Sequence, residues 1–310
     1  MRVFMNYGFE GKRFYIDYAS CSRPVGNMRE ESDKRAVEVY ETSITKKLLL
    51  SLSSGIDSQS VLHSFHQQGI PLETVFMHTP GYNDNEFLNI QRIDAKYSIK
   101  TQVIEIDPAA IKDELEAEAA ETGIHVYSLL FKRFLQQIPK DYDFVQMTHD
   151  PYVHISPRKI FYWFMGYNSP EILRDRAFKM VERTGRNIFY GDTSEFTLSI
   201  INDSIFSAAL YSARYFSENG LSKPGVKLDS LDRWDYYIKP LLYGKYWKDE
   251  LIYFPKYVGF EKLDWLSGPS GIRNHGVTIP YYEFINFLKQ EPGIVKRFYE
   301  NVDPTPPKKE

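Results

Sequence analysis

The chain has a single cysteine, Cys21, among its 310 residues. One cysteine forms neither an internal disulfide nor a cysteine-based zinc cluster, and it favours a reducing compartment. The sequence also has no run of about 18 apolar residues and no secretory signal, so we expect a soluble cytoplasmic protein with no membrane partner. The net charge of −3 provides no global basic field, and nucleic acid is therefore not indicated as a partner.

Apolar side chains are abundant, at 43% of the residues, and they can build a sizeable core. The 23 tyrosines and 21 phenylalanines favour packing in that core or in interfaces over the stacking of nucleic-acid bases.

The most informative stretch is KLLLSLSSGIDSQSVL, at residues 47–62. Its nearly continuous run of leucines predicts a buried parallel strand. A turn of small residues follows, and Asp57 and Ser58 then open a helix. Loop N–H groups, the helix dipole and serine hydroxyls together make an anion site, for which a phosphate is the expected ligand.

This loop is not the G-x-x-x-x-G-K-[ST] phosphate loop, because no lysine follows its glycine. It resembles the S-G-G-x-D-S signature of the PP-loop ATP pyrophosphatases, a superfamily that includes asparagine synthetase, NAD synthetase, GMP synthetase, QueC-type enzymes and PAPS reductase. The matching residues are Ser53, Ser54, Gly55, Ile56, Asp57 and Ser58. Ser54 replaces the first glycine of the signature, and its Cβ is tolerable there if φ is negative.

The resemblance implies that the chain cleaves ATP between the α and β phosphates, with Mg²⁺, and releases pyrophosphate. Relatives of the asparagine synthetase type begin with a glutaminase domain, whose catalytic cysteine follows the initiator Met. Arg2 stands at that position here, and only about 45 residues precede the loop, so we expect no glutaminase domain.

The order of the predicted elements is β-α-β-α-β, which indicates an α/β fold. We expect a parallel five-stranded sheet, of order 3-2-1-4-5, with helices on both faces, an N-terminal β-hairpin and a C-terminal helical annex. The predicted parts are a hairpin and linking helix at 1–42, a PP-loop domain at 43–255, the annex at 256–300 and a disordered tail at 301–310.

Two segments at predicted strand ends resemble nucleotide-site segments of the superfamily. The first is the end of the second predicted strand, and the resemblance implies that backbone groups of Phe76, Met77 and His78 lie beside the adenine. The second follows the fifth strand and is similar to the G-x-G-A-D-E loop of asparagine synthetases, with Gly191 at the nucleotide. It implies magnesium ligands, for which carboxylates are suited, and the candidates are Asp57, Asp192 and Glu195. Asp192 is alternatively an N-cap of the long helix expected to run to about residue 219.

Polar residues after the fourth predicted strand point toward the cleft at the carboxyl ends of the strands. The candidates for binding substrate there and in the glycine-rich loop 267–276 are His149, Asp150, Arg158, Lys159 and Arg273. The basic members suit a carboxylate or a phosphate. A zinc site of His149, Asp150 and His154 is an alternative that has no clear further protein ligand.

The segment YIKPLL and the residues after it resemble the K-P-L…K-x-E segment found late in PP-loop enzymes. The resemblance implies that a lysine meets the phosphates, and Lys239 is the first candidate and Lys245 the second. With Asp57, these are the predicted catalytic residues. A lysine would neutralise the charge that builds up on the leaving pyrophosphate. The alternative is a lysine-decorated amphipathic helix.

The leading hypothesis is an ATP-dependent ligase or transferase that adenylates a carboxyl or carbonyl oxygen of a small-molecule substrate. An amine, free or delivered by a partner protein, then displaces AMP, as in asparagine synthetase. One alternative is sulfur chemistry of the PAPS-reductase or thiolation type, with a thiol brought by a partner. Another is an inert nucleotide-binding protein, which Ser54 favours. A homodimer is expected by analogy alone.

Overall fold

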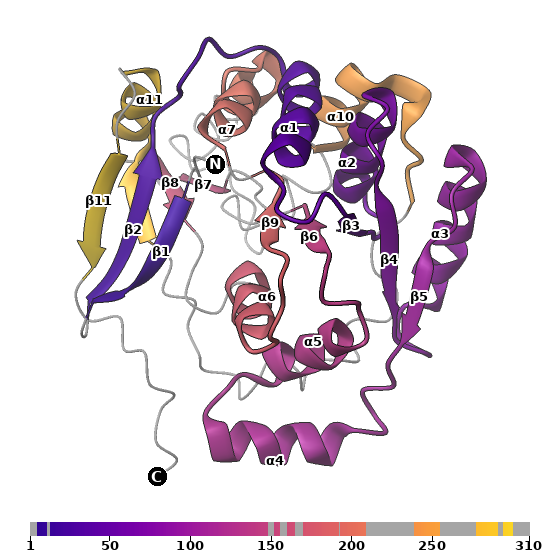
Figure 1. The fold of residues 1–310 in the computed structure, drawn as a ribbon. Helices are drawn as coiled ribbons and strands as arrows, with labels where there is room; N and C mark the ends of the chain where they lie inside the picture. The colour runs from indigo at the N-terminus through magenta and orange to yellow at the C-terminus, as the bar shows by residue number, and fades with distance from the viewer. Residues whose placement is uncertain are drawn as a thin grey trace, which may run out of the picture.

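The computed structural model describes residues 5–10, 13–147, 152–155, 160–164, 170–191, 193–208, 239–254, 277–290 and 294–299 (Figure 1). Its centre is a parallel sheet in the order β5-β4-β3-β6-β9. The strands are β3 (Leu48–Ser51), β4 (Glu73–His78), β5 (Gln102–Glu105), β6 (Asp143–Gln146) and β9 (Asn187–Phe189). The predicted order 3-2-1-4-5 is therefore confirmed.

Helices cover both faces of this sheet. One face carries α1 (Met28–Thr42), α2 (Ile56–Gln67) and α3 (Asp84–Tyr97). The other carries α4 (Lys112–Thr122), α5 (Val126–Gln136) and α6 (Pro170–Lys179). Leu48 and Leu50 of β3 belong to the first core cluster, and Leu49 belongs to the second. A strand with both faces buried needs apolar residues at every position, which explains the leucine run.

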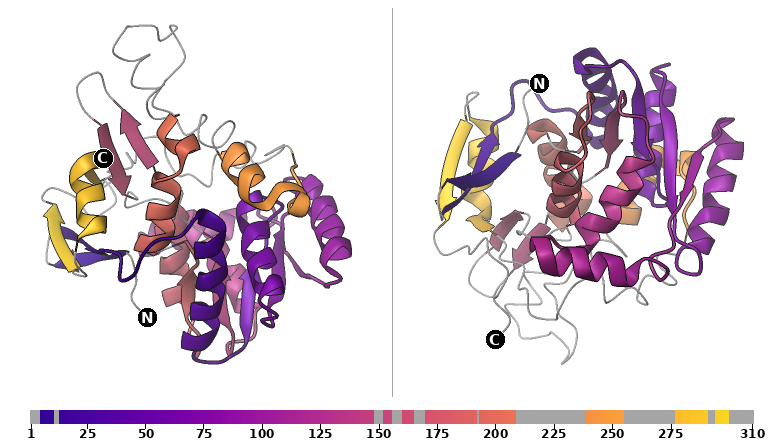
Figure 2. Two further views of the ribbon diagram at one scale, coloured as in Figure 1. Left: turned by 90° about the horizontal axis from the view of Figure 1, so that it is seen from above. Right: turned by 60° about the horizontal axis from the view of Figure 1, so that its bottom comes forward.

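An N-terminal and a C-terminal part of the chain meet in a second sheet, in which β2 lies between β1 and β11 (Figure 2). The predicted hairpin is present as β1 (Met5–Glu10) and β2 (Arg13–Ala19), and β11 (Ile294–Tyr299) pairs antiparallel with β2. In a third sheet, β8 (Ile160–Phe164) lies between β7 (Tyr152–Ile155) and β10 (Val277–Pro280).

The C-terminal annex is thus not helical throughout. Within 256–300 it has one described helix, α11 (Tyr281–Lys289), and the strands β10 and β11. The expectation of a helical annex over 256–300 is wrong for residues 294–299, because this segment, IVKRFY, supplies the second neighbour of β2. Pairing with a distant strand satisfies backbone groups at an edge of the hairpin, which a helix there would leave open.

Two further helices lie at the carboxyl end of the sheet. The helix α7 (Ser194–Ile201) packs against α1 and α11, and α10 (Lys239–Trp247) continues into the 3₁₀ turn η2 (Lys248–Glu250) beside α1. The long helix expected to residue 219 ends at Ile201, because the Asp203 carboxylate accepts a hydrogen bond of 2.7 Å from Ile205 N–H and begins a new turn.

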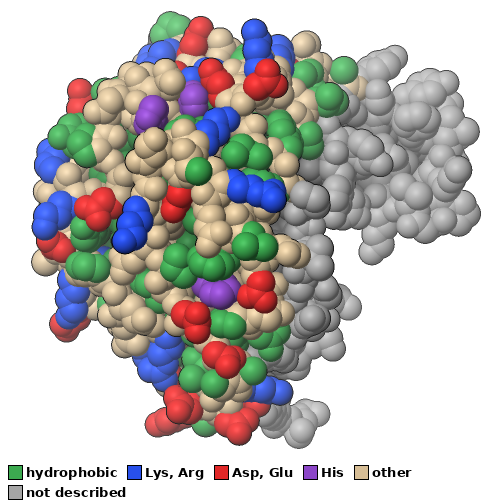
Figure 3. Space-filling view, turned by 90° about the vertical axis from the view of Figure 1, so that its right-hand side faces the viewer, with side chains coloured by type: hydrophobic (Ala, Val, Ile, Leu, Met, Phe, Trp, Pro, Cys, Tyr) green, Lys and Arg blue, Asp and Glu red, His purple; other side chains and the backbone are tan. Residues whose placement is uncertain are grey.

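The surface fits the balanced composition of the sequence. Figure 3 shows acidic and basic side chains mixed with small apolar patches on the face that carries the β5 side of the sheet. Of the helices that the structure describes, none combines the length and the apolar character that crossing a membrane requires.

The start of β6 depends on one buried carboxylate. Asp143 is fully buried and accepts hydrogen bonds from the backbone N–H groups of Ile44, Thr45 and Arg186, at 2.6, 3.2 and 2.6 Å. Replacing it in Asp143→Ala leaves these three donors without their acceptor. We expect the free energy of unfolding to fall by about 3 kcal/mol or more, measured by urea denaturation.

The control is Asp141→Ala, two residues earlier. Asp141 is exposed and pairs with the exposed Lys47. Pairs of this kind contribute little, so the urea midpoint should stay close to that of the unchanged protein. Equal losses in the two variants would contradict the role given to Asp143.

Candidate functional site

The predicted phosphate loop lies at the carboxyl end of β3, as the sequence indicates. Leu52 N–H still donates to Val75 O at 2.9 Å, and the chain then leaves the sheet and enters α2 with Gly55 as the N-cap. Ser53 and Ser58 close the loop: Ser53 N–H donates to Ser58 Oγ at 3.0 Å, and the two hydroxyl oxygens lie 2.9 Å apart. The strand, loop and helix thus follow one another as predicted.

Ser54, the departure from the superfamily signature, fits without backbone strain. Among the described residues, the only non-glycine residues with positive φ are Lys46, Ser98 and Lys248, so Ser54 avoids the left-handed region. Its side chain is 7% exposed, and its hydroxyl donates to Glu86 Oε1 at 3.2 Å. From the sequence, this serine is expected to be tolerated if its φ is negative, and that condition is met.

The loop meets a buried lysine. Lys239 Nζ forms an ion pair with Asp57 Oδ2, and the Lys239 side chain is only 2% exposed. The second carboxylate oxygen, Oδ1, is buried and has no hydrogen-bond partner in the part of the chain that the structure describes. Burying an ammonium group is costly unless it is paired, so the contact fixes α10 against the first turn of α2.

The two predicted lysines are separated by the geometry of their helix. Lys239 and Lys245 are six residues apart, and six positions along an α-helix rotate the side-chain direction by about 240°. The two lysines therefore point away from different sides of α10, and they cannot both face the loop. Lys245 pairs with Asp203 at 2.6 Å, and Tyr246 also donates to that carboxylate. The hydrogen bond from Lys245 to Asp203 raises the pKa of the lysine. The structure thus brings Lys239 together with Asp57, and holds Lys245 elsewhere.

Several side chains of α1 to α3 anchor the segment that carries Lys239. Arg29 donates to Glu250 Oε2 at 2.5 Å and lies over the Trp247 ring, and Tyr97 OH donates to the Glu250 carbonyl at 3.1 Å. His63 lies between them, with Nε2 2.7 Å from Arg29 Nη2. Burial, with the Arg29 charge, lowers the pKa of His63, so the neutral ring can accept from the guanidinium.

The segment predicted to lie beside the adenine forms the last three residues of β4. The carbonyl of Met77 accepts from Asn83 Nδ2 at 2.9 Å, and that of His78 from Ile106 N–H at 2.9 Å. The His78 ring stacks on Phe87 with centroids 4.8 Å apart, and Phe76 is 3% exposed. The next residue, Thr79, has a buried hydroxyl without a partner among the described residues. Contact of Phe76, Met77 and His78 with adenine stays a prediction.

The predicted magnesium ligands are not assembled by the described residues. Gly191 follows β9, but Asp192 lies outside the described residues, and the N-cap of α7 is Thr193 rather than Asp192. Glu195 accepts hydrogen bonds from the backbone and the hydroxyl of Ser22. Within the described ranges, no group of three or more His, Cys, Asp or Glu is placed to hold a metal ion.

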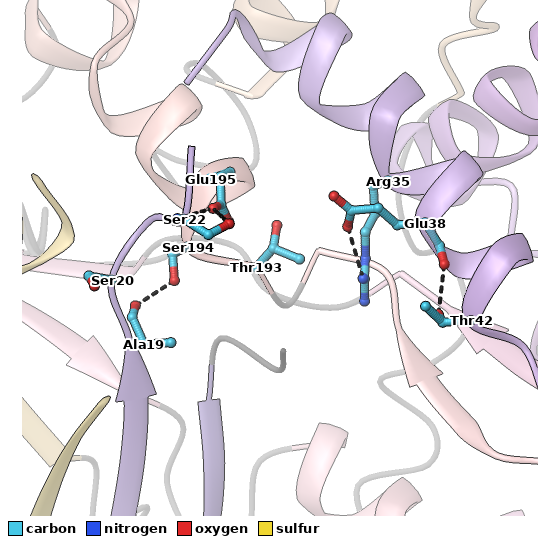
Figure 4. A pocket seen from close by; sticks show the side chains of 9 residues that line it. All are labelled: Ala19, Ser20, Ser22, Arg35, Glu38, Thr42, Thr193, Ser194 and Glu195. Atoms are coloured by element: carbon cyan, nitrogen blue, oxygen red, sulfur yellow. Dashed lines mark hydrogen bonds and ion pairs between the residues drawn. The ribbon is translucent and has the colours of Figure 1, made fainter. Parts of the chain in front are cut away.

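A cavity of about 220 Å³ lies beside Glu195, between the end of β2, α1 and the start of α7 (Figure 4). Its lining residues are Ala19, Ser20, Ser22, Arg35, Glu38, Thr42, Thr193, Ser194 and Glu195. Arg35 is buried and donates to the carbonyls of Phe189 and Tyr190, at 3.4 and 3.1 Å, at the carboxyl end of β9. Sequence reasoning missed this arginine because α1 carries no motif.

The predicted substrate residues His149, Asp150, Arg158, Lys159 and Arg273 lie outside the described residues, so their role stays a prediction. His154 falls in β7, where the backbone alone is described, and the zinc alternative is equally untested. Sequence reasoning missed the strands β7 and β8, which lie in the stretch that carries all of these residues except Arg273.

The lone cysteine bears on the sulfur alternative. Cys21 is 9% exposed, and its backbone N–H donates to Leu288 O at 3.1 Å. Burial, with the nearby Glu195 and Glu31 carboxylates, raises the pKa of its thiol to about 12. A buried thiol that keeps its proton is a poor nucleophile and a poor sulfur carrier.

No family model matches the chain, and no curated protein does. One similar solved structure is the NH3-dependent NAD synthetase from Campylobacter jejuni subsp. jejuni NCTC 11168 in complex with the nitrate ion. It is 11% identical, with a TM-score of 0.33, and the match covers 74% of this chain and 97% of that one. A likeness this low carries no argument about what this chain binds.

The raised pKa of Cys21 gives a testable pH dependence. Thiolate is the reactive form, and at pH 8 a group with a pKa of about 12 is thiolate in about one molecule in ten thousand. We expect the folded protein to react with a disulfide reagent at least about 100-fold more slowly than the chain unfolded in urea. The folded rate should still be rising between pH 8 and pH 10. A folded rate equal to the unfolded one would contradict the burial of the thiol.

Proposed function

We propose that the chain is an ATP-dependent adenylating enzyme of the PP-loop type. ATP binds at the loop of residues 53–58, a carboxyl or carbonyl oxygen of a small-molecule substrate attacks the α phosphate, and pyrophosphate leaves. An amine, free or delivered by a partner protein, then displaces AMP in an amidation like that of asparagine synthetase. The observation that carries the proposal is the ion pair between the buried Lys239 and the partly exposed Asp57, beside a strand, loop and helix N-terminus of the kind that binds anions.

The residues fit a bound nucleotide. Backbone N–H groups at the start of α2, together with the Ser53 hydroxyl, are donors for phosphate oxygens, and the Ser58 hydroxyl shapes the loop by donating to Ser53 O at 2.8 Å. Lys239 supplies a positive charge in a site screened from water, where it acts more strongly than on the surface. Such fixed donors and charges stabilise the negative charge that develops on a leaving pyrophosphate.

The residues also fit a magnesium ion. Asp57 Oδ1 is a buried carboxylate oxygen that no described donor satisfies, and Mg²⁺ takes carboxylate oxygens as ligands. Asp57 would therefore hold the ion, and Asp192 and Glu195 remain further candidates. When bound, Mg²⁺ neutralises phosphate charge. Asp57 has a second task, which is to hold the Lys239 ammonium group at the loop.

The test is the fate of ATP labelled at the α phosphate, with Mg²⁺ and pooled carboxylate, nucleobase and amine substrates. We expect the unchanged protein to form AMP and pyrophosphate. Asp57→Ala and Lys239→Met should each lose at least about 100-fold in turnover, because each removes a charge at the phosphates.

The matched control is Lys245→Met. It also removes a lysine of α10 whose partner is an aspartate, but one that does not belong to the loop. It should keep its turnover within about threefold of the unchanged protein. Release of ADP and phosphate would overturn the mechanism. Binding of ATP without cleavage in any pool would favour the inert nucleotide-binding alternative.

A further inference from the structure

A buried glutamine of α2 joins the phosphate loop to the segment that follows Lys239. Gln59 is fully buried, and its Nε2 group donates to Ser54 O at 2.9 Å and to Ile252 O at 2.8 Å. Its Oε1 accepts from Ile252 N–H at 2.9 Å. One carboxamide therefore contacts the backbone of the loop and, in both directions, the backbone of a residue 193 positions later.

The bond to Ser54 sets the direction of a loop peptide. In a trans peptide the carbonyl and the following N–H point to opposite sides. With its carbonyl held by Gln59, the Ser54 peptide must turn the N–H of Gly55 away from Gln59. That N–H lies on the side of the Ser53 hydroxyl, to which it donates at 3.2 Å. This is the side of the loop on which the serine hydroxyls gather.

One further hydrogen bond links the Ile252 segment to the start of α10, where Lys239 lies. Tyr253, the next residue, donates its hydroxyl to Pro240 O at 2.8 Å, and Pro240 directly follows Lys239. Lys239 in turn pairs with Asp57, two residues before Gln59. The contacts thus form a closed circuit from Gln59 through Ile252, Tyr253 and Lys239 back to the start of α2.

We propose that Gln59 is a positioning residue that sets the Ser54 peptide of the phosphate loop and, through Ile252 and Tyr253, holds Lys239 in place at that loop. The inference rests on the proposed function for its catalytic consequence, and on the geometry alone for the positioning. Glutamine suits the task because it carries two donors and an acceptor on one planar group. A glutamate has the same shape, but its carboxylate only accepts hydrogen bonds, so it could not donate to the carbonyl oxygens of Ser54 and Ile252.

The experiment compares Gln59→Met and Gln59→Glu with two single-hydroxyl variants. Tyr97→Phe removes the bond to Glu250 O, which anchors the same segment, and the 3.1 Å contact of the hydroxyl with His63 Nδ1; neither touches the loop. Tyr253→Phe removes the bond to Pro240 O at a side chain that is 44% exposed, so folding should be kept. Amide hydrogen exchange without nucleotide and the kinetics of AMP formation are measured for all four variants.

We expect Gln59→Met to speed exchange at least about tenfold in peptides covering both residues 52–58 and residues 251–254. Tyr97→Phe should speed exchange only around residues 248–251. In kinetics, Gln59→Met should lose at least about tenfold in kcat and raise KM for ATP, and Gln59→Glu should lose more. Tyr253→Phe should lower kcat about threefold or more with KM unchanged, because only Lys239 is loosened.

Unchanged loop exchange in Gln59→Met, or equal effects in Gln59→Met and Tyr97→Phe, would overturn the proposal. If either Gln59 variant does not fold, Tyr253→Phe decides, and a kcat equal to that of the unchanged protein counts against the circuit. If the unchanged protein forms no AMP, the proposed function fails. Exchange in the nucleotide-free protein then still decides whether Gln59 positions the two segments.

Discussion

A lysine side chain that is buried away from water needs a carboxylate partner, and the burial of Lys239 imposes this constraint on the chain. The lysine is 2% exposed, and it pairs with Asp57 at the first turn of α2. Because Asp57 belongs to the loop after the central strand β3, the pair fixes α10 over the carboxyl end of the sheet. The late segment of the chain is thus docked on the early one by charge as well as by packing.

The anchors of this segment largely contact its backbone. Tyr97 and Lys96 both donate to the carbonyl of Glu250, and Gln59 pairs with Ile252 through both backbone groups. Hydrogen bonds to backbone groups fix the path of the main chain. They do not depend on which side chain the contacted residue carries. Arg29 adds a bond to the Glu250 carboxylate and a contact with the buried Trp247 ring, which closes the segment on α1.

The sequence predicted the parts of the fold that depend on local pattern. A leucine run buried on both faces defines β3, and the small residues after it define the loop, so the sheet order and the strand-loop-helix connection could be foreseen. Residues 294–299 were misread because their strand depends on β2, almost the whole chain away. The choice between Lys239 and Lys245 depended on the rotation of α10, and the role of Gln59 on Ile252. Neither leaves a signal in the spacing of residues.

The distance along the chain between Gln59 and Ile252, 193 residues, has a consequence for biosynthesis. A chain made from its N-terminus completes the serine loop and α2 long before α10 emerges. A nascent chain, or one truncated before α10, therefore contains the loop of residues 53–58 without the lysine that pairs with Asp57. Under the proposed mechanism, which needs both groups, turnover begins only after α10 has been made, so chains that end before Lys239 would not consume nucleotide.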